Sequence, residues 1–141
     1  MNRSVLALTL LVSFFFPTAS YAEWVKVAED DNGNLRYIDT NIKNQDGHIY
    51  FWQLTDILKP ETAPLPGILS IKLYLEADCW KFRFRFRQVF LHKQPMGAGS
   101  GDVLEPPNKS DKAQMDKWKY PAPSPGIGVV IEAACKMAKN Q

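Results

Sequence analysis

The longest alternating pattern of the chain runs from Ile68 to Leu91. Apolar side chains occupy odd positions before Cys79 and even positions after it. Alternation with a period of two is typical of a β-strand with one buried and one solvent-exposed face. Because the phase changes at Cys79, one straight strand would turn half of its hydrophobic side chains to water. The pattern therefore predicts a β-hairpin that turns around residues 78–81, through a four-residue loop or a bulge near Cys79.

The two faces of this hairpin have different pairs of side chains. The buried-face pairs that we expect are Ala77 with Phe82, Leu75 with Phe84, and Leu73 with Phe86. The exposed-face pairs that we expect are Glu76 with Arg83, Tyr74 with Arg85, and Lys72 with Arg87. A slip of one residue would turn a whole strand over, so the hydrophobic pattern fixes which face is buried.

The exposed face of the second strand carries a ladder of cations at every other position. The basic face that we propose from the sequence comprises Lys72, Lys81, Arg83, Arg85 and Arg87. Its steps along one strand are about 6.6 Å, which is twice the rise per residue. Arginine forms paired hydrogen bonds with carboxylates and sulfates, so the ladder predicts a surface that recognises anions. The alternative is a solvated face whose charge is neutralised by Glu76 and other carboxylates.

The first 22 residues are typical of a secretory signal peptide. A positive charge at Arg3 precedes an apolar run over 5–16, and Ser20-Tyr21-Ala22 places small residues where a signal peptidase cleaves. The run is too short and too early to be a membrane anchor, and we expect no transmembrane segment in the mature chain. No cysteine follows the run, so we do not expect a lipoprotein. The mature chain would be one domain, residues 23–141.

The remaining pattern predicts an α+β domain. We expect strands at 24–28, 35–38 and 48–58, a helical turn around 42–43, and a flexible loop rich in Gly and Pro at 92–107. An edge strand is expected within 101–104, a strongly polar, mobile segment at 108–117, and a docked strand at 118–120. Strand 48–58 has apolar residues on both faces and should be central. A helix should follow Ser124 as its N-cap. Its apolar stripe comprises Ile127, Val130, Ile131, Ala134, Cys135 and Ala138.

Cysteine usage and charge limit the possible functions. The two cysteines, Cys79 and Cys135, form an even count in an exported chain, which favours one disulfide over free thiols or a redox site. That bond would attach the helix to one face of an antiparallel sheet. Without Arg3 the chain has 16 basic and 15 acidic residues, so no general attraction to nucleic acid or anionic membrane is expected. The phenylalanines that oppose the arginines should be core rather than a base-stacking platform, so we expect no nucleic-acid partner.

No group of residues has the spacing of a catalytic, metal or cofactor site. His48 and His92 have no other ligand at metal-binding spacing, and both are expected to be solvated. Ser100 lies between two glycines but lacks the flanking pattern of a nucleophile elbow. We therefore expect neither an enzyme nor a bound metal or cofactor.

A series of short motifs resembles the surface-adhesin protein E family of Gram-negative bacteria over residues 24–136. In order, these are Trp-Val-Lys-Val at 24–27, Tyr-Ile-Asp at 37–39, Trp-Gln-Leu at 52–54, Tyr-Leu-Glu-Ala-Asp-Cys at 74–79 before the arginine-rich strand, Pro-Met-Gly at 95–97, Trp118, Pro-Gly at 125–126 and Cys135. The resemblance implies an antiparallel sheet with a C-terminal helix bound to it by the Cys79–Cys135 disulfide. It also implies binding of host matrix and serum proteins.

These observations predict an exported binding protein without enzymatic activity, in the periplasm or at the cell surface. Its expected partner is a protein or an acidic polysaccharide, and an exposed edge strand is available for pairing in a homodimer. Two alternatives remain open. One is a periplasmic structural or assembly accessory protein without a host ligand, and the other is a small-molecule carrier, which rests only on the abundance of aromatic residues.

Overall fold

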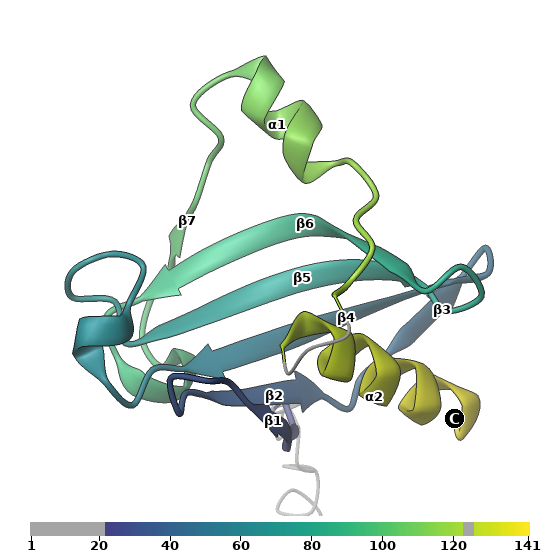
Figure 1. Ribbon diagram of the computed structural model, residues 1–141, viewed down its shortest axis with the longest axis horizontal. Helices are drawn as coiled ribbons and strands as arrows, with labels where there is room; N and C mark the ends of the chain where they lie inside the picture. Colours follow the sequence, from purple (N-terminus) through teal and green to yellow (C-terminus); the bar gives the residue numbers. More distant parts are fainter. Residues whose placement is uncertain (1–21, 123–125) are drawn as a thin grey trace, which may run out of the picture.

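The computed structural model describes residues 22–122 and 126–141, and the predicted signal peptide thus lies outside the described residues except for Ala22. One antiparallel sheet of seven strands has the order β1-β2-β4-β5-β6-β7, with β3 paired to β4 (Figure 1). The strands are β1 (Trp24–Glu29), β2 (Leu35–Asp39), β3 (Lys43–Gln45), β4 (His48–Asp56), β5 (Ser70–Asp78), β6 (Arg83–His92) and β7 (Asp102–Val103). The helices are α1 (Lys109–Met115) and α2 (Ile127–Lys139), and two short 3-10 turns are η1 (Pro60–Thr62) and η2 (Pro95–Gly97). The predicted α+β class is confirmed.

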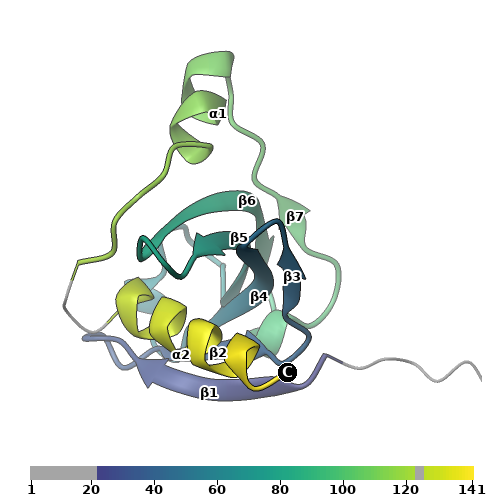
Figure 2. The same ribbon diagram turned by 90° about the vertical axis from the view of Figure 1, so that its right-hand side faces the viewer.

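The sheet curves, and α2 lies on its concave side (Figure 2). The predicted apolar stripe of α2 is the face that packs on the sheet, with Val130, Ile131 and Ala134 fully buried. These side chains meet a cluster from β2, β4, β5 and β6, whose buried members include Ile38, Ile49, Phe51, Leu75, Ala77 and Phe84. The core of the domain is therefore the contact between α2 and the concave face formed by β2, β4, β5 and β6.

The predicted disulfide between Cys79 and Cys135 is present and joins the end of β5 to the last turns of α2. The two Cα atoms are 5.8 Å apart and 56 residues apart in sequence. Both cysteines pack against the core cluster. The bond therefore fixes the β5–β6 turn to the helix, as the sequence predicts.

The β5–β6 hairpin is present, but its predicted register is wrong by two residues. Asp78 pairs with Arg83, and Glu76 pairs with Arg85. The loop between the strands is the four-residue segment 79–82, so the four-residue loop is confirmed and the start of the second strand is later than expected. Side chains alternate between the two faces of a strand, so a shift of two residues leaves each side chain on its predicted face. Phe84 therefore stays on the core face, and Arg83 and Arg85 stay on the opposite face.

The chemistry of the turn explains this difference. Asp78 Oδ1 accepts hydrogen bonds from the backbone N–H groups of Trp80 and Lys81, both at 3.1 Å. Phe82 has a φ of 47°, which closes the loop before the strand begins. An aspartate that binds the N–H groups of the following residues favours a turn over a strand. Phe82 therefore belongs to the turn and not, as predicted, to a buried-face pair, whereas Trp80 lies in the turn at a position within the predicted 78–81.

A bulge in β6 changes the pairing further along the hairpin. Leu75 pairs with Phe86, whereas Tyr74 pairs with Gln88, so Arg87 is the extra residue. Beyond the bulge Leu73 pairs with Val89. The bulge returns the apolar residues of β6 to the concave side, since their positions change from even to odd at Arg87.

Two smaller expectations are wrong. The segment after Asp39 forms β3, which pairs with β4, and not a helical turn. The polar segment 108–117, where no helix was expected, contains α1, which begins after an Asn108 cap and stands away from the sheet on two extended arms (Figure 1). The Ser124 cap lies outside the described residues, and α2 begins after Gly126. Within 22–122 and 126–141, no helix is both long enough and apolar enough to cross a membrane.

Candidate functional site

The five predicted cations do not form one ladder. Lys81 lies in the turn and is exposed, whereas Arg83 and Arg85 lie on the convex face of β6. Arg87 occupies the bulge, and its side chain is 40% exposed. Lys72 lies on β5 opposite Phe90, where its Nζ is 5.9 Å from the centre of the Trp24 ring. The basic residues are therefore divided between the hairpin turn, the convex face beside it, and a separate aromatic contact.

Arg83 and Arg85 have carboxylate partners within the chain. Arg83 Nε donates to Asp78 Oδ2 at 3.1 Å. Arg85 donates through Nε and Nη2 to the two oxygens of Glu76, at 2.8 and 3.0 Å. A paired hydrogen bond of this kind fixes the guanidinium in one orientation. Much of the charge of these two arginines is thus neutralised inside the protein.

Glu76 is the centre of this convex ionic cluster, which we define as His48, Glu76, Asp78, Arg83, Arg85 and Arg87. The Glu76 side chain is only 2% exposed, and its Oε1 lies 2.8 Å from His48 Nδ1. Arg87 Nη1 is 3.7 Å from Glu76 Oε2 and equally far from Asp116. Burial alone raises the pKa of Glu76, but the hydrogen bonds from Arg85 and His48 and the charge of Arg85 outweigh it, so its pKa lies below the usual value.

The same contacts also shift the pKa values of Asp78 and Arg85. Burial raises the pKa of Asp78, but the Lys81 N–H group, the Arg83 hydrogen bond and the Arg83 charge outweigh it, and the net shift is downward. The hydrogen bond to Glu76 raises the pKa of Arg85 despite burial. The two carboxylates of the cluster are therefore ionised at neutral pH and paired with Arg83 and Arg85.

Trp118 covers the two paired arginines. The Arg83 and Arg85 guanidinium carbons lie 4.3 and 4.5 Å from the centre of its ring. The segment that carries Trp118 is held along β6 by two backbone hydrogen bonds between Lys119 and Phe84, of 2.8 and 2.9 Å. The predicted docking of residues 118–120 is thus present as a single β-bridge. A tryptophan on two stacked guanidinium groups is a favourable cation–π contact, and it leaves less of each arginine open to a partner.

The hairpin tip, residues 79–82, exposes aromatic side chains beside the ionic cluster. Trp80 is 94% exposed and Phe82 is 41% exposed. The tip is nevertheless well fixed, because Asp78 binds two of its N–H groups and Cys79 is bonded to α2. The sequence analysis did not identify Trp80 as a surface residue. The signal in the sequence is Asp78 at the end of the alternating run, because an aspartate favours a turn and thereby places Trp80 outside the strand.

The expected solvation of the histidines is wrong. His92 is buried, and its Nδ1 is 3.3 Å from the carbonyl oxygen of Ala98. His48 is half-buried between Glu76 and Trp118, with its ring edge-on to the indole at 5.1 Å. Among the residues that the structure describes, no group of three or more His, Cys, Asp or Glu is arranged to hold a metal ion.

The fold and this surface define a class of protein: a small α+β domain with a curved antiparallel sheet, a C-terminal helix bound to it by a disulfide, and ionic and aromatic groups on the convex side. The profile of the family described as Surface-adhesin protein E matches residues 24–136. The chain therefore belongs to the surface-adhesin protein E family, as its motifs predict.

A solved structure with the same fold supports the architecture. Crystal form II of Haemophilus influenzae protein E superposes with a TM-score of 0.58 and 15% sequence identity, covering 79% of this chain and 87% of that chain. At this identity the likeness concerns the fold alone. No curated protein matches the sequence.

Proposed function

We propose that this protein is an exported binding protein without enzymatic activity, which holds a partner protein or an acidic polysaccharide at the hairpin tip and the adjoining cations Lys81 and Arg87. Membership of the surface-adhesin protein E family supports the adhesive role. The observation that carries the proposal is Trp80, a large aromatic side chain held in solvent on a turn with a fixed conformation.

The tip has the properties of an interaction anchor. Tryptophan, tyrosine and arginine dominate the energy of protein interfaces when they enter a pocket of the partner. Phe82 adds apolar surface beside Trp80, and exposed Tyr120 follows the bridge that aligns residue 119 with the start of β6. Because the turn is already ordered in the free protein, little conformational entropy is lost when it binds.

The positive charge that remains available lies at the edge of this surface. Lys81 is exposed in the turn, and Arg87 is the most exposed arginine of the cluster. Arg83 and Arg85 serve to hold the convex face in shape, since each is paired with a buried carboxylate. An acidic partner would therefore contact Lys81 and Arg87 while the aromatic residues supply the apolar contact.

Binding to a panel of heparin, extracellular-matrix proteins and serum proteins tests the proposal. The test variant is Trp80→Ala with Lys81→Gln, and the matched control is Leu58→Ala with Lys139→Gln, which removes an exposed apolar group and an exposed charge elsewhere. We expect the tip variant to lose salt-sensitive binding while the control retains it. Equal binding by the two variants, or no binding by the unaltered protein, contradicts the proposal.

Localisation separates the adhesive role from that of a periplasmic accessory protein. Protease treatment of intact cells removes a protein displayed on the surface and spares one inside the envelope. We expect removal, with a periplasmic enzyme as the protected control. Protection of this protein would favour a structural or assembly role without a host ligand.

A further inference from the structure

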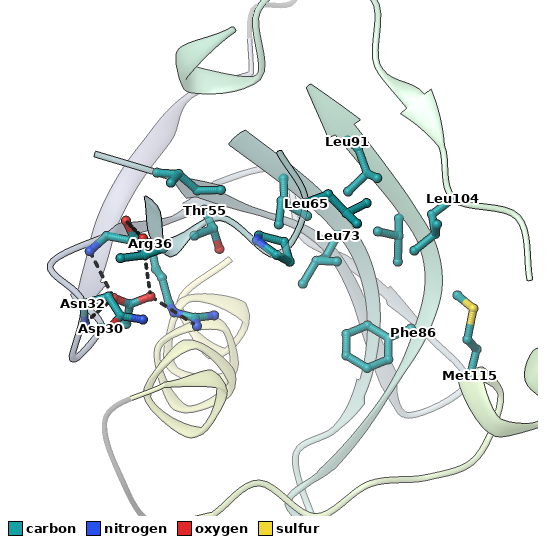
Figure 3. A pocket seen from close by; sticks show the side chains of 16 residues that line it. Asp30, Asn32, Arg36, Thr55, Leu65, Leu73, Phe86, Leu91, Leu104 and Met115 are labelled. Carbon is teal, nitrogen blue, oxygen red and sulfur yellow. Dashed lines mark hydrogen bonds and ion pairs between the residues drawn. The ribbon is translucent and has the colours of Figure 1, made fainter. Parts of the chain in front are cut away.

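An open groove lies on the concave side of the sheet, in the part that α2 does not cover (Figure 3). Its volume is about 650 Å³, which is typical of sites for small organic ligands. Side chains of β2, β4, β5 and β6 form its floor, and residues of the loops around Leu65 and Leu104 form its walls. The groove is on the face opposite the convex ionic cluster and is separate from the surface discussed above.

The floor of the groove changes from polar to apolar across the strands. Arg36 pairs with Thr55, Thr55 with Ile71, and Ile71 with Leu91, so these four residues form one row across the sheet. Neighbouring strands are about 4.8 Å apart, and three such steps give a row of roughly 14 Å. The row begins at a charged residue on β2 and ends at an aliphatic residue on β6.

The polar end of the groove offers hydrogen-bond donors. Asp30 Oδ1 is occupied by the N–H groups of Asn32 and Asn34, at 2.9 and 3.0 Å. Asp30 Oδ2 is 3.8 Å from Arg36 Nη2, an ion pair too long for a hydrogen bond. Arg36 Nε is buried and has no hydrogen-bond partner among the described residues. Thr55 Oγ1 already accepts from Gln53 at 2.8 Å, so its hydroxyl hydrogen remains to donate.

The other end of the groove is apolar. Its residues are Leu73, Phe86, Val89, Leu91, Leu104 and Met115. Figure 3 shows Leu91, Leu104 and Met115 at the end away from Arg36 and Asp30. The four strand residues, Leu73, Phe86, Val89 and Leu91, lie on the face that forms the core beneath α2, but here they remain partly exposed. Burial of this surface by an apolar chain is favourable.

We propose that the groove binds a fatty acid, with the carboxylate on the Arg36 guanidinium and the alkyl chain across β4, β5 and β6 toward Leu104. A carboxylate only accepts hydrogen bonds, which matches the unused donors of Arg36 and Thr55. A monoanion suits one guanidinium better than a dianionic phosphate does, because Asp30 lies beside it. An alkyl tail fits the apolar side chains that β5 and β6 place on the floor, which include Ile71 and Leu91 at the end of the row that begins at Arg36.

Titration with dodecanoate, below its micelle concentration, tests the assignment, with dodecanol as the uncharged comparison. We expect the intact protein to bind dodecanoate and to show NMR shift changes at groove residues. Arg36→Gln should weaken dodecanoate binding at least tenfold and leave dodecanol binding unchanged. Val89→Trp, which fills the floor, should weaken both. Lys139→Gln is the charge-matched control and should alter neither.

Several results would overturn the proposal. The first two are a folded protein that does not bind dodecanoate and an Arg36→Gln variant that binds it with unchanged affinity. The others are NMR shift changes at the hairpin tip instead of the groove, and a ligand-free dimer in which the second copy of the chain fills the groove. If Arg36→Gln does not fold, Arg36→Lys supplies the test. It keeps the charge but loses the planar fork, so we expect an intermediate affinity, and an unchanged affinity would contradict the predicted geometry.

Discussion

Glu76 is almost completely buried, yet it faces His48 from β4 and two arginines from β6. A carboxylate in this position exchanges its water for N–H donors, which compensates the cost of burial only while every partner remains. The folded-state pKa lies below the unfolded value of about 4.3. Its stabilising effect is therefore complete above that unfolded value and is lost as the pH falls through the folded-state pKa.

Glu76→Gln should lower the free energy of unfolding by roughly 2 kcal/mol at pH 7, below the range for fully buried pairs because the arginines reach solvent. The variant should also show a shallower loss of stability on acidification below about pH 5 than the unaltered protein. Urea unfolding at several pH values measures both effects. Glu132→Gln, on the exposed face of α2, is the control and should behave like the unaltered protein. Parallel pH curves for Glu76→Gln and the unaltered protein would contradict this role.

Some residue positions could be predicted from the sequence and others could not. Alternation correctly places Arg83 and Arg85 opposite the core. Their cross-strand partners, predicted as Glu76 for Arg83 and Tyr74 for Arg85, were assigned wrongly, because the Asp78 turn shifts the pairing by two residues. Trp118 reaches the arginines from a segment that follows α1, and no local pattern relates it to them.

The β5–β6 hairpin and α2 behave as one unit because the disulfide connects them. The bond closes a loop of 56 residues and joins the two elements that contribute most of the core. In the chain-entropy description, closing such a loop stabilises the folded state by about 4 kcal/mol. It also holds the hairpin tip at its base, beside Trp80.

Replacing both cysteines, Cys79→Ser with Cys135→Ser, should lower the free energy of unfolding by about 4 kcal/mol. The amide hydrogens of the hairpin tip should then exchange faster than those of β1 and β2, which the disulfide does not touch. Denaturant titration and hydrogen exchange measure these effects, and the unaltered protein under reducing conditions is the matched comparison. A loss below about 1 kcal/mol would contradict the structural role of the bond.

Helix α1 has no buried residue and depends on its cap. Asn108 Oδ1 accepts a hydrogen bond from the Asp111 N–H at 2.9 Å. Asn108→Ala should destabilise the helix by about 1 kcal/mol and accelerate amide exchange over 109–115, without changing the global melting temperature. Ser110→Ala is the control within the same helix. A lower global melting temperature would show that α1 is part of the cooperative core.

The elements were predictable to the extent that local pattern determines them. The apolar stripe identified α2, and alternation identified the hairpin. The sequence analysis missed α1 because it is mostly polar and has no apolar stripe, although Asn108 and Asp111 have the spacing of a helix cap. The pairing of β3 with β4 depends on tertiary contacts that hydrophobic periodicity does not contain.

The whole molecule presents two different faces. The convex side has paired ions and an exposed aromatic tip. The concave side has α2, as Figure 2 shows, and the groove beside it. The sequence predicted the helix on one face and the arginines on the other. It could not predict the groove, which depends on how far α2 extends over the curved sheet. The two faces should therefore be separable by mutation.

The central claim is that Trp80 anchors the partner, and the affinity of the Trp80→Ala variant tests it most directly. Because Trp80 is 94% exposed, this change should alter the free energy of unfolding by less than about 0.5 kcal/mol. For the tightest partner of the binding panel, the account predicts a dissociation constant at least tenfold higher with an unchanged melting temperature. A dissociation constant equal to that of the unaltered protein would contradict it.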